Sequence, residues 1–485
     1  MEIGAVLRLV NLDAVGLNSD EVVYAGQAAA LAGNPAFTDT FPVFRAHPML
    51  VQTLLSVVYR HGEPDTVGRV VIAVIGVATI GVVYLIGHEL YDRRTAVIAA
   101  AVFAVMPYHV IVTRQILLDG PMVLLASLTL LCIAKYGRTG RISWLLTAGG
   151  ATGLTMLAKE TSLVLVGGVY AFLALTPRVR RPIVGTLAAV FVIVVVFLTH
   201  PLTQALAGYS STGKSYLLWQ LLRPPNHGWE FYAVTVPAAI GPLVLLAAVL
   251  GAWLWRPGDG WREVLLVCWI LAPVVAFELW PVKGFQYLLP IAPAVAVLAA
   301  RGVLGLPSVR RGWLTAVPGG IHTVAAVVIV GSLLVATVPH VFSTARTEIL
   351  AGSGGVPGGR ETGRWIRDNT PAGATVMTIG PSMANIVQYY GHRRAYGLSV
   401  STNPLRRNPS YQPIINPDRR LRQADIQYVV WDAFSAARSP YFSDYLKRLA
   451  ERYHGRVVHT EFVSGTGESG RPTEVPIMVV YEVRP

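Results

Sequence analysis

The strongest constraint in this sequence is a series of long apolar blocks without a charged side chain. Residues 70–86 read VVIAVIGVATIGVVYLI, and 183–198, 243–254, 264–277 and 323–338 are similar. A helix needs roughly 20 mainly apolar residues to cross the hydrocarbon core of a bilayer. Only helices and closed barrels satisfy their backbone groups there, and these unbroken runs lack the alternation of barrel strands. The blocks therefore predict a polytopic α-helical membrane protein.

Composition agrees with this prediction. Of the 485 residues, 53% are hydrophobic and 14% are charged, whereas a soluble domain usually carries about a quarter charged residues. The net charge of +13 could suggest a nucleic-acid partner, but basic residues also collect in the cytoplasmic loops of membrane proteins, so no nucleic acid is expected. Cys132 and Cys268 lie inside predicted spans and are expected to be small core residues rather than a disulfide.

About eleven membrane-spanning helices are predicted. They lie near residues 3–17, 67–88, 95–109, 119–135, 144–158, 162–177, 183–199, 234–255, 263–280, 286–304 and 321–338. The first is short for a full crossing and lacks the basic start and cleavage site of a signal peptide, which suggests a helix shortened by the choice of start codon. The pair around Lys159 has almost no loop and could instead be a re-entrant hairpin.

Alternate loops differ in their content of basic residues. The richer set is predicted to be cytoplasmic and holds Arg93, Arg94, Lys135, Arg138, Arg141, Arg178, Arg180, Arg181, Arg256, Arg262, Arg301, Arg310 and Arg311. The loops at 18–66 and 200–233 and the tail after 339 then lie outside. We expect a multi-pass protein of the cytoplasmic (plasma) membrane, and the abundance of Arg, Ala, Val and Gly favours a prokaryote.

The chain divides into three predicted parts. Residues 1–338 form the transmembrane domain, and 339–360 form a linker whose end, AGSGGVPGGR, is rich in glycine. Residues 361–485 are predicted to fold as an extracytoplasmic soluble α/β domain. Its predicted helices are 361–369, 381–390 and 441–453, and its predicted strands are 375–379, 426–431, 457–463 and 477–483.

One nucleotide-binding pattern is present but is not accepted. Residues 208–215 read GYSSTGKS, which fits the phosphate-loop pattern. The pattern has meaning only between a strand and a helix, where backbone N–H groups hold phosphates. Here it follows a membrane helix in a loop predicted to lie outside the cell, so we interpret it as a chance occurrence.

Ionisable and polar residues at the outer ends of the spans are the candidate functional residues, because such groups are costly at membrane depth. The set comprises Asp20, Glu21, His47, Arg114, Asp119, Lys159, Glu160, His200, His227, Lys283, Gln286 and Tyr287. The alternative is an ordinary interfacial role, with snorkelling or helix capping. That alternative is preferred for Arg60, Lys214, His200 and Glu230.

The order of features resembles membrane glycosyltransferases of the C-type (GT-C) fold, in the branch of protein O-mannosyltransferases and aminoarabinose transferases (families 39 and 83). The resembling stretches are LRLVNLDAVGLNSDEVVYAGQAAAL at 7–31, HPML at 47–50, YDRRTAVIAAAVFAVMPYHVIVTRQILLDGPM at 91–122, GLTMLAKETSL at 153–163, HGWEFYAVTVPAAIGPL at 227–243 and KGFQYLLPIAPA at 283–294. They run from residue 1 to about 305. Each motif is weakly specific by itself, and their order and predicted loop sides carry the resemblance.

The resemblance implies an inverting transfer of a sugar from a polyprenyl-phosphate donor to an acceptor at the outer membrane face. The acidic residue that opens the first external loop is the family's catalytic base, which maps onto Asp20 with Glu21 beside it. A carboxylate can take the proton of an attacking hydroxyl, and cations can stabilise the departing phosphate. The donor-phosphate candidates are Lys159, Lys283, Arg114 and His47, and the other pocket candidates are Asp119, Glu160, Gln286, Tyr287 and His227.

Departures from the family pattern bear on metal dependence. The position of a family metal ligand holds Ala46, and the local string NSDE lacks a D-x-D motif. We therefore expect no required cofactor and do not favour a divalent metal, although His200 and His227 leave one possible.

The sugar, the lipid chain length and the acceptor stay open at this stage, and the acceptor could be a protein, a polysaccharide or a lipid. The tail is expected to shape acceptor binding or regulation, and its aromatic residues form either core or a sugar platform, with core favoured: Tyr389, Tyr390, Tyr396, Tyr411 and Trp431. Two other function classes are kept. A lipid or lipid-linked-sugar transporter or flippase should place charges inside spans and often repeats its halves. A non-catalytic assembly protein should tolerate Asp20→Asn.

Overall fold

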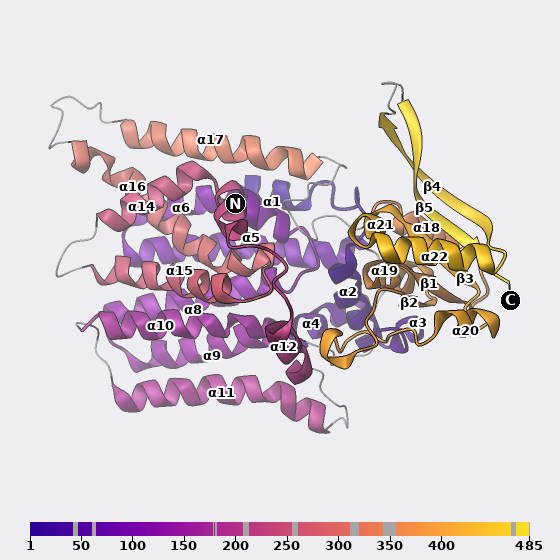
Figure 1. Cartoon of the computed structure of the whole chain (residues 1–485). Helices are drawn as coiled ribbons and strands as arrows, with labels where there is room; N and C mark the ends of the chain where they lie inside the picture. The colour runs from indigo at the N-terminus through magenta and orange to yellow at the C-terminus, as the bar shows by residue number, and fades with distance from the viewer. Residues whose placement is uncertain are drawn as a thin grey trace.

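The computed structural model describes residues 1–41, 47–60, 65–177, 179, 182–206, 213–254, 260–310, 320–342, 356–466 and 472–484. It has two parts, a bundle of long helices and a smaller domain with a β-sheet at one end of that bundle (Figure 1). The chain passes from the first part to the second after α17 (Ile321–Phe342) and enters the sheet domain at α18 (Gly359–Asn369).

Helices occupy all the predicted spans at least in part. They are α1 (Glu2–Leu9), α5 (Asp65–Leu90), α6 (Arg93–Val105), α7 (Pro107–Val112), α8 (Asp119–Thr139), α9 (Ile142–Ala158), η1 (Glu160–Leu163), α10 (Val164–Leu175), α11 (Ile183–Leu206), α13 (Glu230–Ile240), α14 (Pro242–Trp253), α15 (Trp261–Leu279), η2 (Phe285–Ile291), α16 (Ala292–Arg310) and α17. The segments predicted to be external loops add α2 (Ser19–Leu31), α3 (Pro35–Thr38), α4 (Leu50–Tyr59) and α12 (Gly213–Leu222). The polytopic helical prediction is confirmed.

The number of crossings stays a prediction. Among the described residues, five helices are long and apolar enough to span a membrane, and a sixth is added if α13 and α14 count as one span. Those two helices meet at an angle of 96°, because Gly241 takes φ 99°, a left-handed conformation that favours glycine, and Pro242 starts a new helix. The predicted span 234–255 is therefore broken in its middle.

The predicted first span is wrong in its length. Helix α1 ends at Leu9, and residues 10–18 leave the helix. Asn11 adopts a φ of 58°, which interrupts the helical path, and the Arg114 guanidinium donates to the carbonyl oxygens of Leu7 and Val10 at 2.8 and 2.7 Å. Free carbonyls at the end of a helix need such donors, so this arginine fixes the end of α1.

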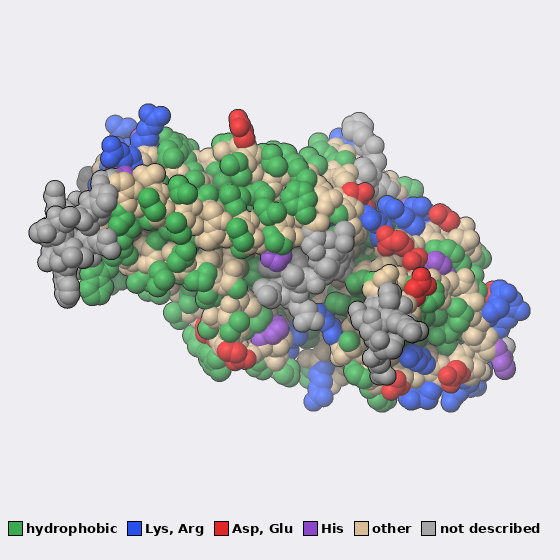
Figure 2. All heavy atoms as spheres, turned by 90° about the horizontal axis from the view of Figure 1, so that it is seen from above, with side chains coloured by type: hydrophobic (Ala, Val, Ile, Leu, Met, Phe, Trp, Pro, Cys, Tyr) green, Lys and Arg blue, Asp and Glu red, His purple; other side chains and the backbone are tan. Residues whose placement is uncertain are grey.

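Burial separates the centre of the bundle from its lipid-facing rim. The apolar stretches of Phe285–Leu306, which joins η2 to α16, and of α8 are 83% and 72% buried, whereas those of α11 and α17 are 11% and 17% buried. Hydrophobic side chains cover the helical part in Figure 2, while most of the charged side chains on that face gather at the two ends of the molecule. A helix that is apolar all round yet exposed in the isolated protein is suited to lipid.

The C-terminal domain contains a five-stranded sheet in the order β2-β1-β3-β5-β4. Its strands are β1 (Thr375–Thr378), β2 (Arg394–Gly397), β3 (Tyr428–Asp432), β4 (Arg456–Thr466) and β5 (Pro472–Glu482). Strands β2, β1 and β3 are parallel, and β5 is antiparallel to β3 and β4. The predicted α/β character is confirmed, although β2 was not predicted.

Alternate residues of this sheet face two different cores, as the pleat requires. Val376 and Val430 pack into the core shared with α18 and α19 (Pro381–Gly391), which is continuous with the core of the helical bundle. Their neighbours Met377 and Val429 pack into a smaller core that includes Leu446 of α22 (Pro440–Arg452). The short helices η3 (Pro404–Arg406), α20 (Pro417–Arg422) and α21 (Ala433–Arg438) complete the domain.

Helix α19 holds the sheet domain against the segment between α1 and α5. The Tyr390 hydroxyl accepts a hydrogen bond from the Leu17 backbone N–H at 2.9 Å and donates to Asp65 Oδ2 at 2.7 Å. The Phe37 ring also packs against Tyr389, with centroids 5.3 Å apart. Tyr389 and Tyr390 are buried, so these two aromatics are core residues of the interface and not a sugar platform.

Candidate functional site

Asp20 lies in the first turn of α2 and opens into a cleft between the two parts of the protein. The Asn18 side chain caps this helix by accepting from the backbone N–H groups of Asp20 and Glu21 at 2.9 and 3.0 Å. The cleft has a volume of about 530 Å³. Its lining combines the bundle and the C-terminal domain: Asp20, Val23, Tyr24, Gln27, His47, Tyr216, Asn408, Ser410 and Tyr411.

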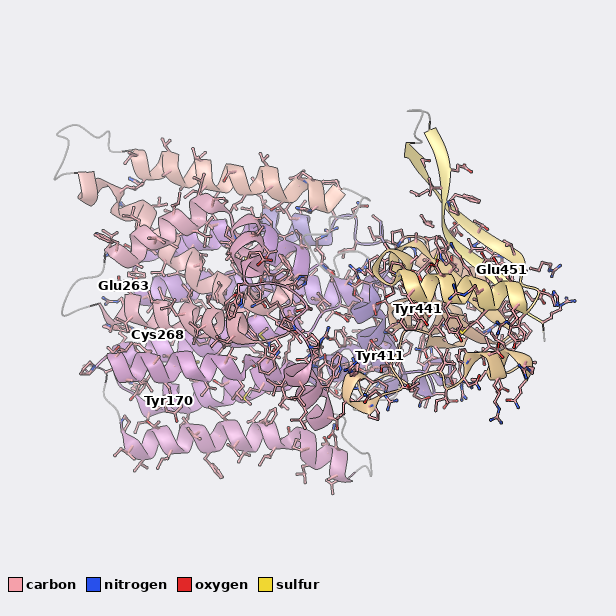
Figure 3. The ribbon with its side chains drawn as sticks, in the orientation of Figure 1. Tyr170, Glu263, Cys268, Tyr411, Tyr441 and Glu451 are labelled. Atoms are coloured by element: carbon pink, nitrogen blue, oxygen red, sulfur yellow. The ribbon has the colours of Figure 1, made fainter. Side chains whose placement is uncertain are left out.

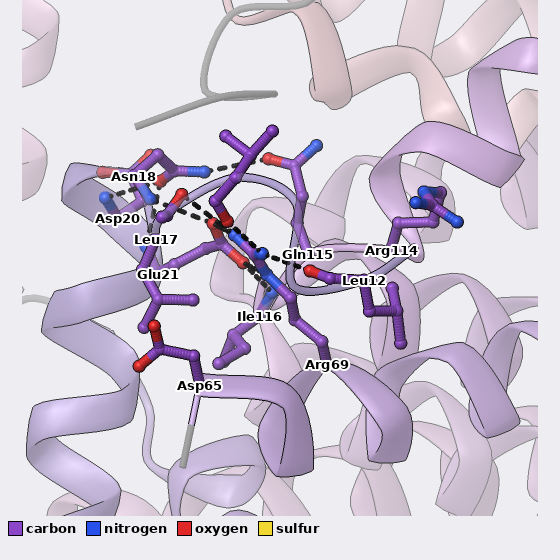
Figure 4. A network of polar contacts seen from close by, with 12 residues as sticks. Leu12, Leu17, Asn18, Asp20, Glu21, Asp65, Arg69, Arg114, Gln115 and Ile116 are labelled. Carbon is purple, nitrogen blue, oxygen red and sulfur yellow. Dashed lines mark hydrogen bonds and ion pairs between the residues drawn. The ribbon is translucent and has the colours of Figure 1, made fainter. Parts of the chain in front are cut away.

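The next residue, Glu21, is enclosed by protein and does not reach the cleft. It is fully buried, and Arg69 donates to its two oxygens from Nε and Nη2 at 2.8 and 2.7 Å. The backbone N–H groups of Ile116 and Asn18 donate to it at 2.9 and 3.0 Å. Figure 4 shows this carboxylate at the centre of a closed network. Its geometry suits an anchor for the start of α2 rather than a base.

A buried ion pair lies beside the cleft, at the start of one helix and the end of another. Asp119 is the first residue of α8, and Lys159 follows the end of α9 in an extended conformation. The Lys159 ammonium contacts the Asp119 oxygens at 2.8 and 2.9 Å and lies 4.9 Å from the centre of the Tyr287 ring. A cation over an aromatic face is stabilised by the ring quadrupole. The structure thus brings three of the predicted site residues together.

His47 and Glu160 form a second pair next to the first. The His47 Nδ1 atom lies 3.0 Å from both Glu160 oxygens. The ring is flanked by Tyr24 and Tyr216, whose centroids are 6.1 and 5.3 Å away. Two acidic and two basic residues from distant loops therefore meet near Asp20, as the convergence on one membrane face predicted.

The pKa of the Asp20 carboxyl is raised, and burial is the largest cause. The side chain is exposed to the cleft, but protein surrounds the cleft, so the charged form is poorly solvated. Lys159 and His47 oppose this rise, while the negative charges of Asp119 and Glu21 add to it. A carboxylate with a raised pKa accepts a proton more readily than an ordinary aspartate does.

Several site residues were not predicted from the sequence, because no motif marks them. Tyr24 and Gln27 follow Asp20 at helical spacing on α2, which is a signal that the sequence carries. Tyr216 follows the rejected phosphate-loop pattern directly. Tyr411, which had been named only as core or a sugar platform, lies at the junction of the two parts in Figure 3 and lines the cleft.

Arg114 and Lys283 use their side-chain donors elsewhere. Arg114 donates to backbone carbonyls at the end of α1, and the Lys283 ammonium contacts Glu278 through the backbone oxygen at 2.6 Å and Oε1 at 3.1 Å. Both arrangements are those of structural cations. His227 is exposed and stacks on Phe231 with ring centroids 4.0 Å apart, and Gln286 is half-buried in η2. The binding roles of these four residues stay predictions.

In the described part of the chain, no group of three or more His, Cys, Asp or Glu side chains is placed to hold a metal ion. Metal dependence therefore stays a prediction. The rejected pattern at 208–215 falls largely outside the described residues, which resume with α12 at Gly213, and the side chain of Lys214 is likewise outside them.

Solved structures share this architecture over nearly the whole chain. ArnT from Cupriavidus metallidurans in the apo state has a TM-score of 0.65 at 13% identity, covering 99% of this chain and 96% of that one. The same protein bound to undecaprenyl phosphate gives 0.61 at 14% identity, with the same coverage. The chain has the C-type fold of membrane glycosyltransferases.

A second solved protein and one protein family are also similar to this chain. The archaeal oligosaccharyltransferase AglB from Archaeoglobus fulgidus, in complex with an inhibitory peptide and a dolichol-phosphate, has a TM-score of 0.57 at 14% identity and covers 98% of this chain and 73% of that one. Residues 46–202 match the family described as dolichyl-phosphate-mannose-protein mannosyltransferase. No curated protein matches the sequence.

Proposed function

We propose that this protein is an inverting glycosyltransferase that moves a sugar from a polyprenyl-phosphate donor to an acceptor hydroxyl, with Asp20 as the general base. The observation that carries the proposal is the contrast between two neighbouring residues in the first turn of α2. The Asp20 side chain opens into the cleft, whereas the Glu21 carboxylate is bound by Arg69. The family match and the C-type fold support the reaction class.

The reaction needs one proton transfer and one displacement. The Asp20 carboxylate takes the proton of the acceptor hydroxyl as the acceptor oxygen bonds to the anomeric carbon. The bond between that carbon and the phosphate oxygen breaks, and the electron pair leaves with the polyprenyl phosphate. Attack from the face opposite to the departing phosphate inverts the anomeric centre.

The departing phosphate needs nearby positive charge. Lys159 supplies it beside Tyr287, and the contact with Asp119 orients this lysine until the donor binds. Arg223 is a further candidate that the sequence did not single out. Its guanidinium lies 4.7 Å from the centre of the Trp219 ring, and no acidic side chain forms an ion pair with it among the described residues.

An apolar cavity inside the bundle suits the lipid tail of the donor. It lies between α8, α9, α10, α11 and α15, and its lining is almost entirely apolar. Thr155 and Ser162 line it and flank Lys159 in the sequence. A prenyl chain held there would place its phosphate beside the lysine. Undecaprenyl phosphate bound to ArnT and dolichol-phosphate bound to AglB support a donor of this chemistry.

We further propose that the reaction takes place on the outer face of the cytoplasmic membrane. Basic residues of the predicted cytoplasmic set form ion pairs at the end of the bundle remote from the C-terminal domain: Lys135 lies 3.5 Å from Glu89, and Arg301 lies 3.8 Å from Glu263. Figure 3 shows Glu263 at that end. By the positive-inside rule, Asp20 and the C-terminal domain are then outside.

The test is sugar transfer by the purified protein from a panel of polyprenyl-phosphate sugars. We expect Asp20→Asn to lower kcat by about 10²- to 10⁴-fold with unchanged thermal stability, and Asp444→Asn, an exposed aspartate on α22, to have no effect. Equal turnover by Asp20→Asn and the native protein would contradict the assignment of the base. Movement of the lipid-linked sugar across a bilayer without transfer would favour the transporter instead.

A further inference from the structure

A second and larger cavity lies between the first external loop and the C-terminal domain. Its volume is about 1140 Å³. Thr40 lines it from the bundle side, Asn385 and Gln388 line it from α19, and Tyr396 lines it from β2. An ion pair at its rim joins Arg394 of the domain to Asp39 of the loop at 3.5 Å. The cavity is therefore bounded by both parts of the protein.

One short turn separates this cavity from the cleft of Asp20. Ser410 and Tyr411 line both spaces. The turn is held by Asn408, whose side-chain oxygen accepts from the Ser410 N–H at 2.9 Å and whose carbonyl accepts from the Tyr411 N–H at 3.0 Å. A molecule in the larger cavity could therefore reach Asp20 past two side chains.

Apart from the Asp39–Arg394 ion pair at its rim, the lining of the larger cavity is uncharged and rich in groups that both donate and accept hydrogen bonds. Asn385 and Gln388 supply amides, and Thr40, Ser410 and Tyr396 supply hydroxyls. The Ser410 hydroxyl oxygen is buried and has no hydrogen-bond partner within the described residues. A buried polar atom without a partner is costly, so this hydroxyl is a candidate contact for a polar ligand.

The position in the sheet is also that of a ligand site. The cavity includes Gly397 at the carboxyl end of the parallel strand β2 and Pro381 at the start of α19. In open α/β sheets, ligands bind outside the carboxyl ends of the parallel strands. Position and lining thus point independently to a bound molecule.

We propose that this cavity binds a carbohydrate acceptor and presents one of its hydroxyls to Asp20. The inference rests on the proposed transferase function and adds the class of the second substrate. Sugar hydroxyls both donate and accept, which matches amides and hydroxyls, and Tyr396 and Tyr411 add aromatic side chains to the same lining. A lipid acceptor would instead need an apolar groove at this position.

The experiment compares two glutamine variants of the full-length protein in lipid nanodiscs. Gln388→Ala removes an amide from the cavity, and the control Gln423→Ala removes an exposed one at the end of α20. With short neutral oligosaccharides of glucose, mannose or galactose as acceptors, we expect Gln388→Ala to raise the acceptor KM about tenfold. The donor KM and kcat should be unchanged, and the control should behave as the native protein.

Saturation-transfer NMR of the same oligosaccharides, without donor, separates the two proposals. Binding that weakens in Gln388→Ala while no donor is turned over would support the site and overturn the transferase. Transfer to Ser/Thr peptides or to a lipid hydroxyl, with no binding of oligosaccharides, would overturn the carbohydrate class. Transfer to oligosaccharides with equal KM in both variants would overturn the placement of the acceptor in this cavity.

Discussion

Adjacent residues in one helical turn have opposite chemical surroundings in this protein. Asp20 opens into a cleft, while Glu21 meets Arg69 and two backbone N–H groups. The sequence predicted an acidic pair at this position, but it could not show which carboxylate faces the cleft and which anchors the helix. Arg69 and Ile116 come from α5 and the loop before α8, and their approach to Glu21 depends on the tertiary fold.

Glu21 should matter for stability more than for chemistry. Glu21→Gln leaves the Arg69 guanidinium buried without its counter-charge, and breaking such a pair typically costs about 3–5 kcal/mol. We expect a clearly lower Tm in detergent, measured by thermal unfolding, while Glu474→Gln on the exposed part of β5 leaves Tm unchanged. A Glu21→Gln protein with native Tm and no activity would show that Glu21 acts in the reaction itself.

The raised pKa of Asp20 predicts the acid side of the pH profile. A base must be unprotonated, so activity falls as the pH drops through this pKa, at a higher pH than the roughly 3.9 of an ordinary aspartate. His47 holds the pKa of Asp20 down. Replacing it, as in His47→Gln, should therefore shift the acid limb of kcat/KM to higher pH. A shift to lower pH, or none, would contradict this electrostatic link.

At the scale of elements, helices α14 and α16 pack at backbone distance. A Cβ atom added at Gly302 would overlap the carbonyl oxygen of Ala247, and one added at Gly251 would overlap that of Leu298. We expect Gly302→Ala to destabilise the protein by about 1–3 kcal/mol through overpacking, measured by thermal unfolding in detergent. Gly331→Ala on α17, where a Cβ meets open space, is the control and should be neutral or slightly stabilising. Equal effects would contradict the close packing.

The sequence predicted elements well where length and apolarity decide them, and less well where a distant contact does. Helices α5, α8 and α11 extend over their predicted spans because each has enough apolar residues to be recognised alone. The end of α1 depends on Arg114, far along the chain. Strand β2, with the sequence RAYG, is too short to show an alternating pattern and exists through its pairing with β1.

The residues of the candidate site also divide into those that local sequence marks and those that only the tertiary fold brings in. Asp20, His47, Asp119, Lys159, Glu160 and Tyr287 were named from their positions at span ends, and the structure brings them together. Tyr216 comes from the short helix α12 and Asn408 and Ser410 from a turn, and no recognisable motif marks them. Their place in the cleft follows from how the C-terminal domain docks on the bundle, which local sequence does not encode.

At the scale of the whole molecule, Tyr390 couples the two parts. Its hydroxyl accepts from the Leu17 N–H and donates to Asp65. Tyr390→Phe would leave the Leu17 N–H without this acceptor, at a cost of about 1–3 kcal/mol, and would leave Asp65 only its ion pairs with Arg364 and Arg360 at 3.9 and 4.0 Å. We expect faster hydrogen exchange in α2 and α19 than in the native protein, measured by mass spectrometry. Tyr441→Phe, at an exposed tyrosine of α22, should leave exchange unchanged. Native exchange rates in Tyr390→Phe would show that the aromatic packing suffices.

The cleft is lined by residues near both ends of the chain, Asp20 at one and Ser410 with Tyr411 at the other. A ribosome makes the first of these before most membrane helices and the last only after all of them. A nascent or prematurely ended chain can therefore be inserted in the bilayer with its aspartate in place but without the wall of its cleft. Completion of synthesis, rather than membrane insertion, is the step that assembles the wall of the cleft.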